Sequence, residues 1–134
     1  MRISTHKPSC FDRLKAAFGD QLEEQWENGL IITFAGVVHT KAGGLTPEFA
    51  AHEEVHIRQQ AKYDPEVFLE KFISDPKFRL EMEMEAYRAQ AAFIRRVVRD
   101  RNAQAKKIDK MCRDMASNYA GMITYPEALK AMLK

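Results

Sequence analysis

Two histidines stand four residues apart in the segment His52-Glu53-Glu54-Val55-His56. On an α-helix this spacing places both imidazoles on one face, and the pattern H-E-x-x-H is typical of helices that bind zinc through the two histidines. The glutamate after the first histidine can then serve as the general base toward water activated by the metal. The pattern therefore predicts a centre for one zinc ion, with His52 and His56 as ligands and Glu53 as the catalytic residue.

The residues around the motif predict the helix that must position it. Thr46 is a typical N-cap residue, Pro47 fits the first helical position, and the helix should run to about Lys62. The opposite face carries charged residues at i,i+4 spacing, as a solvated face does, namely Glu54, Arg58 and Lys62. The motif should therefore face inward, where two imidazoles and a carboxylate without partners would be destabilising. A bound metal would supply the partner, and hydrogen bonds to other core side chains are the alternative.

A catalytic zinc site needs one more protein ligand and leaves its fourth position to water. Three glutamates, Glu81, Glu83 and Glu85, lie in a second segment with helical periodicity. Glu83 borders the apolar stripe of this segment and can reach a metal held by the first helix, so it is the predicted third ligand. The other two glutamates should lie at the surface, paired with arginines. The stripe consists of Leu80, Met84, Tyr87, Ala91, Ile94 and Val98, and the arginines are Arg79 and Arg88.

Together these residues resemble the gluzincin group of zinc metallopeptidases, in which a glutamate on the next long helix is the third ligand. The resemblance is carried by His52-Glu53-x-x-His56 and Glu83-x-x-Ala86, and it covers about residues 30 to 90. It implies one zinc ion held by His52, His56 and Glu83, with Glu53 as the base and a peptide or protein as the substrate. Small, minimal gluzincins, many of them short phage or bacterial proteins, are also similar in three segments: Ile31-Ile32-Thr33-Phe34, His56-x-x-Gln59 and Glu83-Met84-Glu85-Ala86-Tyr87.

Further residues could support this chemistry. Larger gluzincins often carry Asp or Asn directly after the alanine, where it orients a ligand histidine. Here that position is Tyr87, whose phenol could do the same through a hydrogen bond. Gln59 and Asp100 are other candidates for such support. Peptide hydrolysis also develops an oxyanion that a tyrosine or histidine can stabilise, and the sequence leaves four candidates open: Tyr87, Tyr119, Tyr125 and His39.

A β element should precede the motif helix. The segment from Leu30 to Thr40 is rich in β-branched residues and has Ala35-Gly36 at its centre, which indicates either a short hairpin or one strand with a bulge. The resemblance implies that this strand forms an edge of the cleft and binds an extended peptide through its backbone. A strand that only covers the motif helix is the alternative.

The whole pattern predicts one domain, residues 1–134, of mostly helical α+β class. A long N-terminal helix, from about Ser9 to a cap at Asn28-Gly29, should precede the β element and the motif helix. A short connector from Glu66 to about Ser74 should lead to a long helix from Lys77 to about Arg101. This long helix carries Glu83, and two C-terminal helices should follow it.

Composition narrows the possible partners and location. The net charge is +2, from 21 basic and 19 acidic residues, which gives no argument for nucleic acid as a partner. No apolar run reaches membrane-spanning length, so no membrane partner is expected, and the polar N-terminus does not resemble a signal peptide. Cys10 and Cys112 lie far apart, which favours free thiols in a reducing compartment. A cytoplasmic location is therefore expected, meaning the host cytoplasm or the virion for a phage protein.

The predicted function is zinc-dependent hydrolysis of peptide bonds. One alternative keeps the metal without proteolysis, as a structural or interaction protein, for example in phage assembly. Another is a metal-free helical bundle. Glu53 favours the enzyme, because a structural zinc has no use for a base and is usually closed by four protein ligands.

Overall fold

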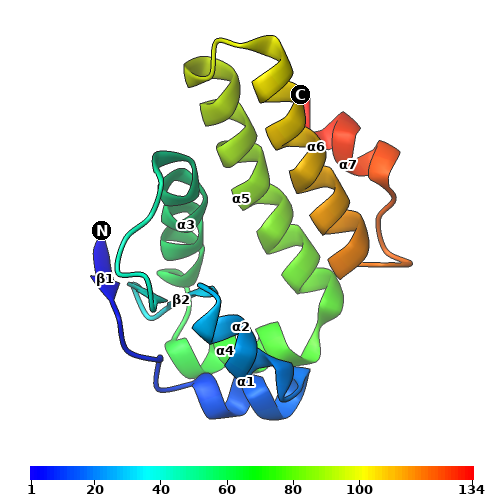
Figure 1. Cartoon of the computed structure of the whole chain (residues 1–134). Helices are drawn as coiled ribbons and strands as arrows, with labels where there is room; N and C mark the ends of the chain where they lie inside the picture. Colours follow the sequence, from blue (N-terminus) through cyan, green and yellow to red (C-terminus); the bar gives the residue numbers. More distant parts are fainter.

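The computed structural model describes all 134 residues and contains seven helices and three strands (Figure 1). In chain order these are β1 (Arg2–Ser4), α1 (Phe11–Phe18), α2 (Gln21–Glu27), β2 (Ile31–Phe34), β3 (Val37–Thr40), α3 (Pro47–Gln60), α4 (Pro65–Ser74), α5 (Pro76–Val97), α6 (Arg101–Asn118) and α7 (Tyr125–Met132). The architecture is α+β and mostly helical, which confirms the expected class. None of the helices combines the length and the apolar character that a membrane span requires.

The strands form a small sheet in the order β1-β3-β2, with β1 parallel and β2 antiparallel to β3. Between β2 and β3 the turn residues Ala35 and Gly36 have φ values of 51° and 81°. Positive φ at both positions is typical of a two-residue hairpin, whose twist matches that of its strands. The hairpin is therefore confirmed and the bulged single strand is wrong. The sequence did not predict β1, since a run of three residues is too short to show periodicity.

The single long helix expected at the N-terminus is wrong, because the chain forms two helices, α1 and α2. Gly19 has a φ of 114°, a conformation that L side chains rarely adopt, and it ends α1. The predicted apolar positions still meet, since α2 folds back on α1. Together with Cys10 and Leu69 they form one buried cluster, which contains Phe11, Leu14, Leu22 and Trp26.

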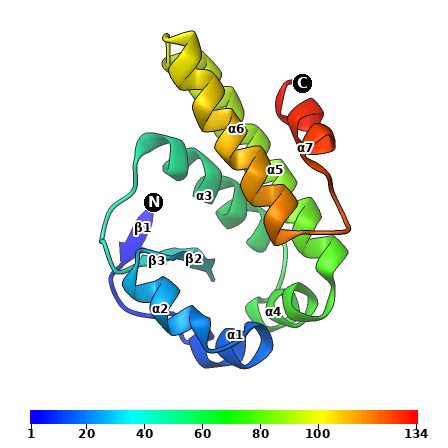
Figure 2. The same ribbon diagram turned by 45° about the vertical axis from the view of Figure 1, so that its right-hand side comes forward.

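The motif helix α3 lies alongside α5 in both views, and α4 connects the two (Figures 1 and 2). They run in opposite directions, because His52 contacts Gln90 whereas Gln59 contacts Met82. Each of α3, α4 and α5 has a proline in its first turn and an N-cap side chain that accepts a backbone hydrogen bond, as the sequence indicates. The capping residues are Thr46, Asp64 and Asp75.

The larger hydrophobic cluster lies between α5, α6 and α7 and fixes α5 against the two C-terminal helices. Its largest members that are almost completely buried are Ile94, Met115 and Met132. The predicted end of the long helix at about Arg101 is too late, because α5 ends at Val97 and Arg101 begins α6. Asp100 caps α6 by accepting hydrogen bonds from the backbone N–H groups of the first turn. It is thus a helix cap and gives no support to the motif histidines.

Candidate metal centre

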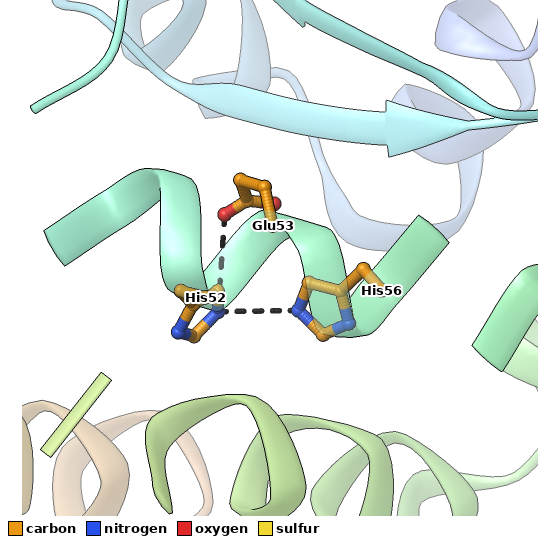
Figure 3. Close-up of side chains that lie close together, drawn as sticks. All are labelled: His52, Glu53 and His56. Carbon is orange, nitrogen blue, oxygen red and sulfur yellow. Dashed lines mark hydrogen bonds and ion pairs between the residues drawn. The ribbon is translucent and has the colours of Figure 1, made fainter. Parts of the chain in front are cut away.

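The motif side chains of α3 divide between two directions (Figure 3). The rings of His52 and His56 point toward α5, with their Nε2 atoms 3.1 Å apart. Glu53 points the other way, toward the hairpin, and its Oε2 lies 3.9 Å from Nε2 of His52. All three side chains are almost completely enclosed, with 8%, 13% and 8% of the side chain of His52, His56 and Glu53 exposed. The inward orientation expected from helical spacing is therefore present.

Glu83 on α5 completes this group. Its Oε1 lies 2.6 Å from Nε2 of His56 and 3.5 Å from Nε2 of His52. Donor atoms bound at about 2.0–2.1 Å around a tetrahedral zinc ion would be about 3.3 Å apart. The two imidazole nitrogens and this carboxylate oxygen therefore form a donor set of suitable chemistry and size for zinc.

Glu53 could compete for the metal, since His52, Glu53 and His56 also offer three ligand atoms within 4.8 Å of one another. Glu83 is the better ligand on geometry, because its oxygen lies on the histidine side of α3 and closer to both Nε2 atoms. Moreover, Oε1 of Glu53 already accepts a hydrogen bond of 2.9 Å from the hydroxyl of Thr33 on β2. Glu53 is thus held beside the donor set by the hairpin.

The other ring nitrogen of each histidine contacts a glutamine. Nδ1 of His52 lies 2.9 Å from Oε1 of Gln90, and Nδ1 of His56 lies 2.9 Å from Oε1 of Gln59. The amide nitrogen of Gln59 donates to the carbonyl oxygen of Met82 and to a carboxylate oxygen of Glu85, so its oxygen must face the histidine. An amide oxygen only accepts, so each Nδ1 carries the proton. This arrangement directs both Nε2 atoms toward a metal, as hydrogen-bonded histidine ligands require.

Gln90 is a functional candidate that sequence reasoning missed. It is 4% exposed and lies seven residues after Glu83 on the same side of α5. Tyr87, which the sequence suggested as a hydrogen-bond partner for a histidine, makes no such bond. Its ring packs edge-on against His52, with centroids 4.7 Å apart and planes at 76°. The prediction for Gln59 as a supporting residue agrees with its contact to His56, whereas Gln90 takes the place proposed for Tyr87.

Charges in the metal-free centre are strongly coupled. Burial disfavours a charged His56, but its hydrogen bond to Glu83 and the charge of that carboxylate raise the pKa of His56 to about 9. Burial would likewise raise the pKa of Glu83, yet the hydrogen bonds of both histidines hold it well below its usual range. His56 and Glu83 therefore form a buried ion pair at neutral pH. Burial raises the pKa of Glu53 above its ordinary value, as expected for a carboxylate with one hydrogen bond.

Gln60 fastens the hairpin to the motif helix. Its side-chain amide donates to the backbone oxygen of Thr33 at 2.8 Å and accepts from the backbone nitrogen of Ala35 at 3.1 Å. Since β2 is an edge strand of the sheet, these two backbone groups would otherwise lack a partner in the protein. The contact fixes the position of Thr33 relative to α3, and Thr33 in turn fixes the carboxylate of Glu53 beside the donor set. The residues of β2 also line a cleft over the centre, and peptide binding by this strand stays a prediction.

A cleft of about 680 Å³ opens over the centre and is bounded by α1, α2, β2, α3, α4, α5 and the end of α6. Tyr87 and Tyr119 line this cleft, and neither hydroxyl has a hydrogen-bond partner in the protein. The other two oxyanion candidates lie elsewhere. Tyr125 donates to Asp109 at 2.5 Å between α7 and α6, and His39 contacts the backbone oxygen of His6 at 2.9 Å. Only two of the four predicted candidates are therefore placed to meet a substrate.

Comparison of the chain with protein-family models, with curated proteins and with solved structures gives no match.

Proposed function

We propose that this protein is a zinc-dependent peptidase of gluzincin-like architecture, with His52, His56 and Glu83 as the metal ligands. The observation that carries the proposal is the convergence of three donor atoms from two helices beside a carboxylate that other contacts hold. The zinc, when bound, supplies Lewis acidity that polarises a carbonyl and makes water more acidic. The open cleft over the centre supports a peptide or protein as the substrate.

Glu53 is the catalytic residue in this proposal, and its Oε2 is the atom that would take up a proton and release it again. Thr33 binds Oε1 and so fixes the carboxylate, while Oε2 has no hydrogen-bond partner in the protein. The raised pKa of Glu53 helps it to accept a proton near neutral pH and to deliver that proton to a leaving amine. A centre built only for structure would usually have a fourth protein ligand in this place.

Tyr119 is the residue we assign to the oxyanion. Its ring lines the cleft, and its hydroxyl is free to donate to a substrate oxygen. Burial, followed by the nearby negative charge of Glu83, raises the pKa of Tyr119, so the phenol keeps its proton and remains a donor. Tyr87 shares the cleft, but its packing against His52 gives it a role in holding the imidazole.

The test compares zinc content and peptide hydrolysis in the wild type, Glu83→Ala and Glu53→Gln. The wild type and Glu53→Gln should each contain about one zinc per chain, and Glu83→Ala should contain far less. Hydrolysis of a mixed peptide library, read by mass spectrometry, should occur only in the wild type and stop with a chelator. Glu81→Ala is the matched control, because Glu81 is exposed on the same helix and contacts no motif residue.

Two results would contradict the proposal in different ways. Absence of zinc from wild-type protein, even after refolding with zinc, would leave a helical domain whose histidines are satisfied by Gln59, Gln90 and Glu83. Zinc without hydrolysis of any peptide would favour the non-proteolytic structural or interaction protein instead.

A further inference from the structure

One arginine, Arg79, lines the same cleft as the proposed metal ligands. It lies on α5, four residues before Glu83, and is partly buried. The sequence predicted that it would pair with a surface glutamate, and this is wrong, because no carboxylate oxygen lies within 4.0 Å of its guanidinium. The cleft therefore contains a cation that no acidic side chain of the protein neutralises.

The guanidinium of Arg79 is held in place through one nitrogen and by two neighbouring aromatic rings. Nη1 donates to the backbone oxygens of Phe72 and Ile73, at 2.6 and 3.0 Å, at the end of α4. The carbon of the guanidinium lies 4.9 Å from the ring centroid of Phe18 and 5.8 Å from that of Phe72. Capping α4 explains the use of Nη1. It leaves Nη2 and Nε without a partner, and these donors form the fork that suits a carboxylate.

The spacing along α5 limits what can lie between Arg79 and the metal. Four residues of helix rise about 6 Å, and one residue of an extended peptide spans about 3.4 Å. The side chain of Arg79 reaches beyond this rise toward the end of α4, so the last few residues of a peptide can lie between a carbonyl at the centre and a carboxylate at Arg79.

The walls of the cleft around Arg79 are apolar. Aromatic and aliphatic side chains from α1 and α4 line it, and they include Leu14, Phe18, Phe68, Leu69 and Phe72. A large apolar side chain next to a free carboxylate would match both features, since it would bury its surface against these rings while the charge meets Arg79.

We propose that Arg79 binds the C-terminal carboxylate of a peptide whose last residue is large and apolar, which would make the enzyme a carboxypeptidase. This inference rests on the proposed function. The reaction adds one water across a peptide C–N bond within the last few residues of the substrate. The carbonyl carbon gains the hydroxyl group, and Glu53 passes the proton to the departing amine. The carboxylate is the only part of the substrate that Arg79 would touch. Arg79 should therefore contribute to substrate binding and to the choice of the bond that is placed at the centre.

Binding can be measured without turnover in a Glu53→Gln background. A fluorescent tripeptide ending in Phe is prepared as the free acid and as the C-terminal amide, and its anisotropy is followed with metal-free and with zinc-loaded protein. The metal-free protein is needed because zinc itself can bind a carboxylate. In both states the acid should bind at least about tenfold more tightly than the amide, as a charge-assisted fork implies. A tripeptide acid ending in Asp should bind as weakly as the amide.

Arg79→Gln should remove the preference for the acid. Arg79→Lys is the second variant, because lysine keeps the positive charge and can still cap α4, and it should lower the preference without unfolding the protein. Arg88→Gln is the matched control, since Arg88 is exposed on α5 and does not line this cleft. In this variant the ratio of the affinities for the acid and the amide peptide should equal the ratio measured with Arg88 in place.

Equal binding of acid and amide, or a preference that survives Arg79→Gln, would overturn the assignment of Arg79. Hydrolysis of acid and amide peptides at equal rates would do the same while leaving the zinc peptidase intact. An Arg79-dependent preference in a protein that binds no zinc would instead refute the proposed function and retain the carboxylate site.

Discussion

The ion pair between His56 and Glu83 makes a quantitative prediction about the metal-free protein. With a pKa of about 9, His56 is about 99% protonated at pH 7 and about 90% protonated at pH 8. Zinc requires the neutral imidazole, so binding must release this proton. We therefore expect about one proton released per zinc at pH 7, and an apparent affinity that rises about tenfold per pH unit between pH 6 and 8.

The variant Glu83→Gln tests whether the carboxylate of Glu83 is what raises the pKa of His56. The carboxamide cannot hold the positive charge, so the pKa of His56 should fall to its ordinary value of about 6.5 or below. At pH 8 only about 3% of the imidazole would then carry the extra proton. The variant should thus release almost no proton at pH 8, although its zinc affinity will be lower because it lacks a ligand.

Two measurements check this pair of values. The ring resonances of His56, followed by NMR in metal-free protein, should titrate near pH 9 in the wild type and below pH 7 in Glu83→Gln. Zinc titration calorimetry in buffers of different ionisation enthalpy counts the released protons. A wild-type midpoint between pH 6 and 7 would refute the ion pair, because the carboxylate would then not be acting on His56.

The same pair gives the metal-free fold a pH dependence. The pKa of His56 is higher in the folded than in the unfolded protein, so its stabilising contribution is complete below about pH 6.5 and is lost as the pH rises through about 9. Zinc should remove this dependence, because a ligand nitrogen no longer binds a proton.

Two further substitutions test the elements that support the centre. Gln90→Leu removes the acceptor for Nδ1 of His52 and should weaken zinc binding about 10- to 100-fold, whereas Gln90→Glu keeps an acceptor and should retain tight binding. Competition with a chromophoric chelator measures the zinc affinity of both variants. An unchanged affinity in Gln90→Leu would contradict the contact between Gln90 and His52. Ala35→Gly relieves a φ of 51° at an exposed turn residue and should raise the free energy of unfolding by about 0.5–1 kcal/mol. A urea midpoint that falls would show that the turn does not have this conformation.

Much of the centre follows from local rules of helical spacing. His52 and His56 are one turn apart, so they must share a face wherever their helix packs. The start of that helix is also local, because Thr46 and Pro47 act within a single turn. The position of Glu83 beside the apolar stripe of its own helix likewise depends only on periodicity, and the structure places this side chain against both histidines.

The supporting residues could not be predicted in the same way. Gln60, Gln90 and Thr33 act across the contacts between α3, α5 and β2, and those contacts depend on how whole elements pack. The residue type does not reveal whether a glutamine is buried or exposed. The partner can also be distant in sequence, since Gln90 lies 38 residues after His52. The predicted pairing of Arg79 with a glutamate is wrong for a related reason. Its neighbours along α5 include an acid, but its side chain turns to the end of α4.

The break at Gly19 shows how an error in the predicted fold bears on the site. A continuous helix would carry Trp26 about 12 Å along the axis beyond Phe18. With the chain turned at Gly19, α2 returns along α1, and Phe18 is left as the last residue of α1, with its ring against the guanidinium of Arg79. The apolar end of the cleft is therefore made by a corner that one left-handed glycine permits. In this chain the same corner that shortens the N-terminal helix also forms the wall beside which a substrate carboxylate would bind.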